Sequence, residues 1–262
     1  MTGPLDAFGD APFFVHAHPD DESISTGGAI AALVARGASV TIITGTRGER
    51  GEVVAGDLAP LEGTAELAPH RMIELENALE ALGGPHHVFL GTSPARAPGA
   101  ADRLYSDSGM QWGDDGFAEP AADAAPDALS TAPLADVVAD LHTAVRDEHG
   151  HLLASALVSY DARGGYGHPD HVRIHDAARE VARLTGLPFF AIVEPRVLPE
   201  GGGAGGGQVE EFTIRLTPEL LAAKTAAMAA HRSQLTIEPT AFTLSGGQTH
   251  PIPTLERFRR LA

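Results

Sequence analysis

The sequence predicts an α/β fold built on a mostly parallel sheet. Between Pro12 and Val193, short apolar runs alternate with stretches long enough for helices, which is the pattern of repeated βαβ units. Hydrophobic residues make up 43% of the chain and aromatic residues only 5%, so Ala, Val, Leu and Ile must form most of the core. That composition is typical of helices packed on a sheet. A length of 262 residues suits one large domain, or a main domain with a small appendage.

The apolar runs and their end signals place the individual elements. Pro12–Ala17 and Ser39–Thr44 are predicted strands, and a helix from about Ser23 to Ala35 joins them and ends at Gly37, a residue type favoured after helix C-termini. The other predicted strands are Val88–Leu90, Ala154–Tyr160 and Phe189–Val193, and the other predicted helices are Leu67–Leu82, Leu134–Glu148 and Asp170–Leu184. Each loop that follows a strand in this series carries polar residues.

The chain changes character near residue 195. Val209–Leu216 alternates like a strand, and Thr217-Pro218-Glu219 then opens a helix with an N-cap threonine and a proline in the first turn. We therefore predict a main domain over 1–195 and a C-terminal extension over 196–262, made of a strand and a helix, that packs on the same domain.

Two segments lack regular periodicity. Gly91–Thr131 is rich in Ala, Asp, Gly and Pro, and loops of that length are usually lids, binding loops or disordered segments. Gly201–Gly207 is predicted to be a flexible link or a hairpin tip. It lacks the strand-to-helix context and the lysine of a phosphate-binding loop, so we assign it no function.

Charge and composition exclude several classes of function. The chain has 35 acidic and 18 basic residues and a formal net charge of −17, a balance that disfavours nucleic acid and anionic membranes as partners. There is no cysteine, so any metal site must be made of His, Asp or Glu. Neither a secretion signal nor an apolar run of about 18 residues is visible. We expect a cytoplasmic protein that acts on a small molecule.

Two histidine-rich segments predict a metal site. His18-Pro19-Asp20-Asp21-Glu22 follows the first strand, and Tyr166-Gly167-His168-Pro169-Asp170-His171 follows the fourth. In open α/β sheets ligands bind beyond the carboxyl ends of the strands, so we expect both segments at one edge of the sheet. Either segment alone is equally explained by helix capping, since Asp near a helix start satisfies free N–H groups. The pair together favours a metal.

The residue types indicate a catalytic site. His18, Asp21 and His171 offer two imidazoles and one carboxylate, which leaves a coordination position open for water or substrate. Asp20 then remains as a general base beside the metal. His168 and His175 are further candidate ligands by position. Of the remaining histidines, we interpret His16 and His175 as structural residues. Zinc and ferrous iron both accept such ligands.

These segments resemble a known family. His16-Ala17-His18-Pro19-Asp20-Asp21-Glu22-Ser23 and Gly167-His168-Pro169-Asp170-His171 are similar to the two signatures of the zinc-dependent N-acetylglucosaminyl deacetylases, the PIG-L or LmbE-like superfamily. Other segments resemble the mycothiol-biosynthesis branch, whose deacetylase removes acetate from N-acetylglucosaminyl-inositol: Gly48-Glu49-Arg50-Gly51-Glu52-Val53, Arg71-Met72-Ile73-Glu74-Leu75, Phe89-Leu90-Gly91, Ser106-Asp107-Ser108-Gly109-Met110 and Gly164-Gly165-Tyr166. The resemblance implies a Rossmann-like three-layer sandwich whose C-terminal region closes the pocket.

The resemblance also implies roles for the residues that match. His18, Asp21 and His171 are expected to bind zinc, with Fe²⁺ as the alternative, and Asp20 to act as general base. His168 is expected to be the acid or charge-stabilising partner and to be held as imidazolium by Asp170, which orients it. Tyr166 is expected to polarise the amide oxygen. The expected substrate contacts are Glu52, Arg71, Asp107 and Met110.

Several alternatives stay open at the level of sequence. Arg71 stands three residues before Glu74, so a surface ion pair is an alternative to substrate binding, and Asp107 is equally suited to a side-chain-capped turn. Mycothiol S-conjugate amidase is similar in the same signatures, so another amide substrate is the main rival function. A non-haem iron enzyme and a non-catalytic sugar-binding module are the weaker rivals.

Overall fold

The computed structural model describes residues 3–114, 118–193 and 210–261. Over these residues the strands are β1 Pro12–His16, β2 Thr41–Thr44, β3 His86–Phe89, β4 Met110–Trp112, β5 Ala118–Pro120, β6 Ala156–Ser159, β7 Phe189–Ile192, β8 Glu211–Arg215, β9 Leu235–Ile237, β10 Ala241–Leu244, β11 Thr249–Pro251 and β12 Leu255–Arg260. The α-helices are α1 Asp21–Ala35, α2 Leu67–Ala81, α3 Leu134–Ala144, α4 Pro169–Thr185 and α5 Pro218–Ala230, and Pro4–Phe8 and Ala59–Leu61 are short 3-10 helices.

The central sheet has seven strands in the order β3-β2-β1-β6-β7-β12-β8. The first five strands in this order are parallel to one another, and β12 is antiparallel to both β7 and β8. The predicted α/β class with a mostly parallel sheet is therefore confirmed. The antiparallel edge was not predicted as part of the main sheet.

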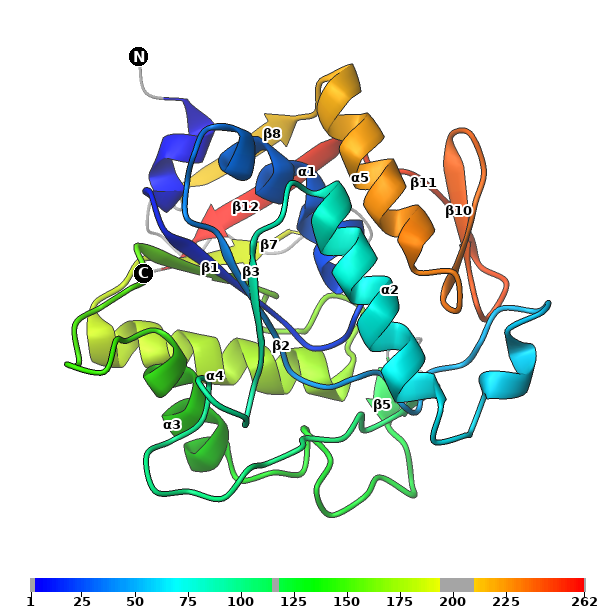
Figure 1. The fold of residues 1–262 in the computed structure, drawn as a ribbon, viewed down its shortest axis with the longest axis horizontal. Helices are drawn as coiled ribbons and strands as arrows, with labels where there is room; N and C mark the ends of the chain where they lie inside the picture. The colour runs from blue at the N-terminus through cyan, green and yellow to red at the C-terminus, as the bar shows by residue number, and fades with distance from the viewer. Residues whose placement is uncertain (1–2, 115–117, 194–209, 262) are drawn as a thin grey trace.

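Helices cover both faces of this sheet, which gives three layers. Figure 1 shows α1, α2 and α5 on one face and α3 and α4 on the other. Each face has its own core. Apolar side chains of β1, β6, α3 and α4 form one core, and those of β1, β2, α1, α2 and α5 form the other, together with Phe8, Phe190 and Phe258. Strands β1, β6 and β7 are buried on both sides, as apolar runs without alternation predict, whereas the edge strand β3 is partly exposed.

The C-terminal extension is integral to the sheet. Strands β8 and β12 form its edge, and α5 packs against α1 and α2. At Gly28 of α1 a Cβ atom would lie 2.2 Å from a Leu216 methyl carbon, so only glycine admits this close packing. The predicted boundary at 195/196 and the glycine run 201–207 lie outside the described residues.

The long segment 91–131 contains regular structure. Strands β4 and β5 pair as an antiparallel hairpin, and a bridge joins Ser106 to Ala128. A second small sheet, β11-β10-β9, follows α5. Among the helices of the described part of the chain, none has both the length and the apolar character needed to span a membrane.

The strand order creates a switch point between β1 and β6. From β1 the chain builds outward through β2 and β3, and it then returns to the other side of β1 to build β6 and β7. Loops that leave β1 and β6 in opposite directions open a crevice at the carboxyl ends of the strands. His18 follows β1 and His168 follows β6, so the fold brings the two predicted segments to this crevice.

Candidate metal centre

Three predicted ligand atoms converge on one point. His18 Nδ1 lies 3.3 Å from His171 Nε2 and 3.5 Å from Asp21 Oδ2, and His171 Nε2 lies 3.4 Å from the same carboxylate oxygen. Ligand atoms about 2.0–2.2 Å from a tetrahedral zinc ion lie about 3.3–3.6 Å from one another. The observed separations therefore match the edges of such a site. The two segments that are distant in sequence do meet.

The hydrogen bonds of the two rings direct their lone pairs into this point. His171 Nδ1 is 3.2 Å from the carbonyl oxygen of Gly164, which can only accept, so the proton is on Nδ1 and the lone pair is on Nε2. His18 Nε2 is 3.2 Å from Asp170 Oδ2, so a neutral His18 has its proton on Nε2 and its lone pair on Nδ1. Three acceptors that face one another repel unless a cation lies between them. This arrangement fits a metal ion, and partners on the outer ring nitrogens are usual for metal-binding histidines.

The surrounding charges also favour a cation. Burial acts to lower the pKa of His18, but the carboxylates of Asp107, Asp170 and Asp21 raise it well above its usual value. For Asp170, burial acts to raise the pKa, but the hydrogen bond and charge of His18 hold it at about 2. Two overlapping groups of potential ligands are formed by His18, His168 and His171, and by His18, Asp107, His168 and Asp170. Carboxylates and imidazoles gathered in this way are ligands that a divalent metal ion accepts.

Tyr160 supports the ligand cluster and was missed as a site residue. Its hydroxyl donates to Asp21 Oδ2 at 2.6 Å and accepts from the backbone N–H of Ala17 at 2.7 Å. Its ring stacks on that of His171, with centroids 4.0 Å apart and an interplanar angle of 6°. The available signal in the sequence was its position at the end of the predicted strand Ala154–Tyr160, next to the second histidine segment.

Asp20 has an unusual backbone conformation. Its φ angle is +107°, and it is the one non-glycine residue with positive φ in the described part of the chain. Such conformations persist where the surroundings hold them, commonly at functional sites. Here the Glu22 carboxylate accepts from the Asp20 backbone N–H at 3.0 Å, and His231 lies 2.8 Å from the same carboxylate. Glu22 and His231 are further residues that the sequence reasoning missed.

The surroundings also change the acidity of Asp20. Burial and the neighbouring carboxylates of Asp21 and Glu22 raise its pKa to about 8, against the opposing charges of His231 and Arg71. A carboxylate with a raised pKa is a stronger base than an ordinary one. Asp20 also lies two residues after the predicted ligand His18 and directly before the predicted ligand Asp21. These features suit the general base that the sequence predicted.

His168 and Asp170 interact differently from the expectation. The Asp170 carboxylate bonds to His18 and to the backbone N–H and hydroxyl of Ser108, while its own backbone N–H donates to His168 Nδ1 at 3.2 Å. Burial lowers the pKa of His168 well below its usual value, and the rings of His18 and His171 add to this. Both observations oppose the expected imidazolium held by Asp170: a His168 ring whose Nδ1 accepts this bond is neutral and has its proton on Nε2. The catalytic role of His168 stays a prediction. The Tyr166 ring lies 6.0 Å from that of His168.

The Arg71 side chain hydrogen-bonds to the backbone of the loop that follows β2, and Glu52 is one of the loop residues that it contacts. Arg71 is 3% exposed, and its guanidinium donates to the carbonyl oxygens of Gly48 and Glu52 and to the Ser233 hydroxyl. A Cβ atom at Gly51 would lie 2.2 Å from Arg71 Nη1, so the loop is closely wrapped around this side chain. In this structure Arg71 anchors the loop. Its contact with substrate stays a prediction, as does that of Glu52.

Asp107 lies beside the ligand cluster, and the contact of Met110 with substrate stays a prediction. Asp107 is buried, with Oδ1 3.8 Å from His18 Nε2, and the same oxygen caps the turn by accepting from the Gly109 N–H. Both sequence-level interpretations of Asp107 are thus compatible with the structure. Met110 is half-buried at the start of β4. Of the other histidines considered, His16 bonds to Thr26 and His175 to the carbonyl of Tyr160, which agrees with their structural interpretation.

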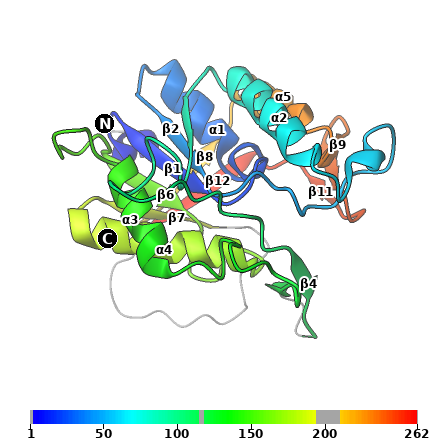
Figure 2. The same ribbon diagram turned by 60° about the horizontal axis from the view of Figure 1, so that its bottom comes forward.

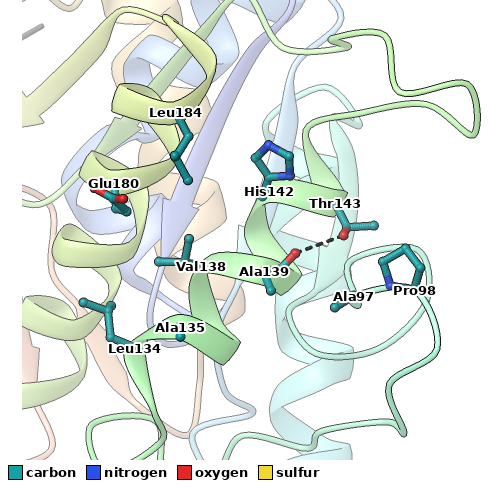
Figure 3. Close-up of a pocket in the computed structure, with 10 residues that line it drawn as sticks. All are labelled: Ala97, Pro98, Leu134, Ala135, Val138, Ala139, His142, Thr143, Glu180 and Leu184. Carbon is teal, nitrogen blue, oxygen red and sulfur yellow. Dashed lines mark hydrogen bonds between the residues drawn. The ribbon is translucent and has the colours of Figure 1, made fainter.

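A separate groove lies between α3 and α4. It has a volume of about 620 Å³ and is lined mainly by apolar side chains such as Leu134, Val138 and Leu184, with His142 and Glu180 at its edges (Figure 3). None of the ligand residues lines it. The groove is therefore separate from the candidate metal centre at the switch point.

Comparison with known proteins agrees with this arrangement. The family model PIG-L, described as GlcNAc-PI de-N-acetylase, matches residues 13–182. A protein of Kineococcus radiotolerans named 1D-myo-inositol 2-acetamido-2-deoxy-alpha-D-glucopyranoside deacetylase is 37% identical, over 94% of this chain and 76% of its own. A protein of the same name from Saccharomonospora viridis is also 37% identical, over 94% of this chain and 92% of its own.

Solved structures share the fold at low sequence identity. A teicoplanin deacetylase, Orf2, in a zinc-inhibited form superposes with a TM-score of 0.59 and 17% identity, over 86% of this chain and 84% of that one. The N,N'-diacetylchitobiose deacetylase of Pyrococcus horikoshii gives a TM-score of 0.55 and 20% identity, over 86% of this chain and 70% of that one. An open sheet of this kind also differs from the β-barrel expected of a non-haem iron oxygenase.

Proposed function

This chain belongs to the PIG-L family, and on that premise we propose that it is a zinc-dependent N-deacetylase that hydrolyses the acetamide of N-acetylglucosaminyl-inositol, a step of mycothiol biosynthesis. The observation that carries the proposal is the convergence of His18 Nδ1, Asp21 Oδ2 and His171 Nε2 within 3.5 Å of one another. The substrate is supported by the names of relatives that are 37% identical over 94% of this chain.

His18, Asp21 and His171 would hold the metal. Bound zinc would polarise the acetamide carbonyl and lower the pKa of a water molecule from about 16 towards about 7. The lone pairs of both rings already point at the position it would take, because the outer nitrogens are bound to Gly164 and Asp170. The metal-binding geometry is therefore preorganised by the protein.

Asp20 acts as the base in this proposal. Its carboxylate accepts the proton of the attacking water and later returns it to the amine that leaves. The hydrogen bond from its N–H to Glu22 helps to hold the unusual backbone conformation of Asp20, between the ligands His18 and Asp21 in the chain.

His168 and Tyr166 stabilise the charge that develops on the amide oxygen. Because Asp170 N–H donates to His168 Nδ1, the His168 proton sits on Nε2, where a neutral imidazole can donate it to the oxyanion. Tyr166 offers its hydroxyl from the neighbouring turn. Loss of one such donor commonly reduces turnover about 10²–10³-fold.

Acetate release tests this function. Purified protein with one equivalent of zinc should release acetate from N-acetylglucosaminyl-inositol, and Asp20→Asn should lower kcat by about 10²–10⁴-fold while zinc stays bound. Asp102→Asn, an exposed change in an ion pair with Arg96, is the matched control and should keep full activity. Release only from a mycothiol S-conjugate would transfer the assignment to the amidase, and undiminished activity in Asp20→Asn would remove the proposed base.

A further inference from the structure

Two exposed aromatic side chains stand at the edge of the metal centre. Trp112 is 56% exposed and Tyr166 is 42% exposed, and their ring centroids are 6.1 Å apart with an interplanar angle of 42°. Trp112 is the only tryptophan in the chain. Isolated exposed apolar residues are ordinary on protein surfaces, whereas two adjacent exposed rings beside a ligand cluster need an explanation.

The aromatic pair is continuous with the ligand cluster. The Tyr166 ring lies 5.2 Å from the ring of His171 and 6.0 Å from that of His168. Trp112 is therefore the next ring outward from the metal, beyond Tyr166. A substrate with its acetamide at the metal and a second ring beyond the amino sugar would extend in the direction of Trp112.

The β4–β5 hairpin holds Trp112 in this position. Trp112 pairs with Ala118 across the hairpin, and the Ala118 N–H donates to the carbonyl oxygen of Tyr166 at 3.1 Å. This backbone bond ties the hairpin to the turn that carries Tyr166. Figure 2 shows β4 projecting from the body of the molecule, away from the central sheet.

The strand geometry links Trp112 to a predicted substrate contact. Side chains alternate along a strand, so Met110 and Trp112 lie on the same face of β4, about 7 Å apart along the chain. Met110 is half-buried and Trp112 is exposed. The exposure of this face thus increases from Met110 to Trp112, and Trp112 extends the surface on which Met110 is expected to contact substrate.

We propose that Trp112 forms a stacking subsite for the ring beyond the amino sugar, the cyclitol aglycone of the substrate. This proposal rests on the proposed function and adds the residue that selects the aglycone. One face of a cyclitol presents C–H bonds, which pack on the electron-rich face of an indole, while the hydroxyl groups at the ring edge stay solvated. Trp112 does not reach the reacting atoms, so it contributes to binding and not to the chemical step.

Fluorescence of the single tryptophan tests the subsite directly. Zinc-loaded Asp20→Asn protein, which turns over slowly, should show a saturable change in tryptophan emission on titration with N-acetylglucosaminyl-inositol. Methyl N-acetylglucosaminide, which lacks the cyclitol, should leave the emission unchanged. No change with the inositol glycoside, or an equal change with both glycosides, would overturn the assignment to the aglycone.

Kinetics supply the second test. Trp112→Ala should raise KM for the inositol glycoside about three- to tenfold with kcat unchanged, and Trp112→Phe should restore most of the loss, because an aromatic stacking contact is worth about 0.5–1.5 kcal/mol. The same variants should leave KM for methyl N-acetylglucosaminide unchanged. Leu184→Ala, at a comparably exposed apolar residue on α4, is the control and should alter neither substrate.

The outcomes separate this inference from the proposed function. If the wild type releases acetate from the inositol glycoside and Trp112→Ala behaves like wild type, the subsite is wrong and the deacetylase stands. If the wild type acts on neither glycoside, the proposed function is wrong, and the fluorescence titration alone then decides whether Trp112 binds the aglycone. A fall in kcat with unchanged KM in Trp112→Ala would also contradict a binding role.

Discussion

Two buried polar clusters in this molecule have opposite organisation. Between α5 and β12, the Lys224 ammonium lies 2.6 Å from Glu256, whose carboxylate also accepts from the backbone N–H groups of Gly28 and Ala29. There, donors face acceptors. In the ligand cluster, acceptor atoms of His18, Asp21 and His171 face one another at 3.3–3.5 Å. Burial of charge alone thus marks no function, whereas ligand atoms that converge at these separations fit a metal site.

The largest expected effect comes from removing a ligand. His171→Ala should lose the bound metal and at least about 10³-fold of kcat/KM, because a Lewis acid contributes several kcal/mol to such a reaction. Elemental analysis and acetate release measure both. His175→Asn is the matched control on the same helix: the Asn amide can replace the hydrogen bond of His175 Nδ1 to Tyr160, so metal and activity should stay. Metal bound at full stoichiometry in His171→Ala would show that His171 is not a ligand.

Removing one charge of the Lys224–Glu256 cluster should lower stability and leave the metal site intact. Lys224→Met leaves Glu256 buried without its cation and should lower the free energy of unfolding by about 3–5 kcal/mol, with metal content and kcat of the folded protein unchanged. Urea denaturation of the zinc-loaded protein measures this. The double variant Lys224→Met with Glu256→Gln should recover part of the loss. A loss of metal in Lys224→Met would mean that the two clusters are coupled.

The contrast between the Lys224–Glu256 cluster and the ligand cluster also explains how far the sequence could predict the structure. The five parallel strands and their helices were predicted, because short apolar runs alternate with helix-length segments along the chain. Strands β1, β6 and β7 are buried on both faces, whereas β3 is partly exposed at the edge. Strand β12 was not predicted, because its buried positions are Glu256 and Phe258, and a buried glutamate removes the apolar alternation that identifies a strand. Its partners, Lys224 and two backbone amides of α1, are distant in sequence, so no local pattern indicates that Glu256 is compensated.

The ligand cluster was predicted more fully than its supports. His18, Asp21 and His171 stand in two short segments whose residue types alone indicate a metal. The contact of Asp170 with His18 in place of His168 depends on how the loops after β1 and β6 face each other, which tertiary packing decides. The same holds for Tyr160. Its hydroxyl reaches Asp21 only because β1 and β6 are neighbours in the sheet.

His87 is a partly buried group whose side chain hydrogen-bonds to a neutral partner. His87 lies 3.0 Å from the Thr44 hydroxyl, and burial lowers its pKa from 6.5 to about 4, with the charge of Arg47 adding to this and that of Glu22 opposing it. Between these pH values the unfolded chain takes up a proton that the folded protein does not, so stability rises with pH across this window and falls as pH drops through it. The loss should reach at most about 3 kcal/mol.

Comparison with a variant isolates this contribution. His87→Gln keeps a group that can bond to Thr44 but does not titrate, so its free energy of unfolding should fall less than that of the wild type between pH 7 and pH 4. The difference between the two proteins cancels acid effects on the ligand cluster. Parallel pH profiles for the two proteins would show that His87 titrates normally.

The smallest expected effect tests how the ligand cluster is supported. Tyr160→Phe keeps the ring that stacks on His171 but removes the hydroxyl that donates to Asp21 and accepts from Ala17. Zinc affinity should fall about 10–100-fold, the usual result of losing a hydrogen bond to a ligand. Competition with a chromophoric chelator measures this fall.

A second buried tyrosine supplies the control for that measurement. Tyr105 donates to Asp140 at 2.7 Å, in a cluster whose donors, including the guanidinium of Arg103, already face an acceptor. Tyr105→Phe should therefore cost stability and leave zinc affinity unchanged. Equal losses of zinc affinity in the two variants would mean that Tyr160 acts through general packing. A loss confined to Tyr160→Phe would show that its hydroxyl orients the Asp21 carboxylate towards the metal.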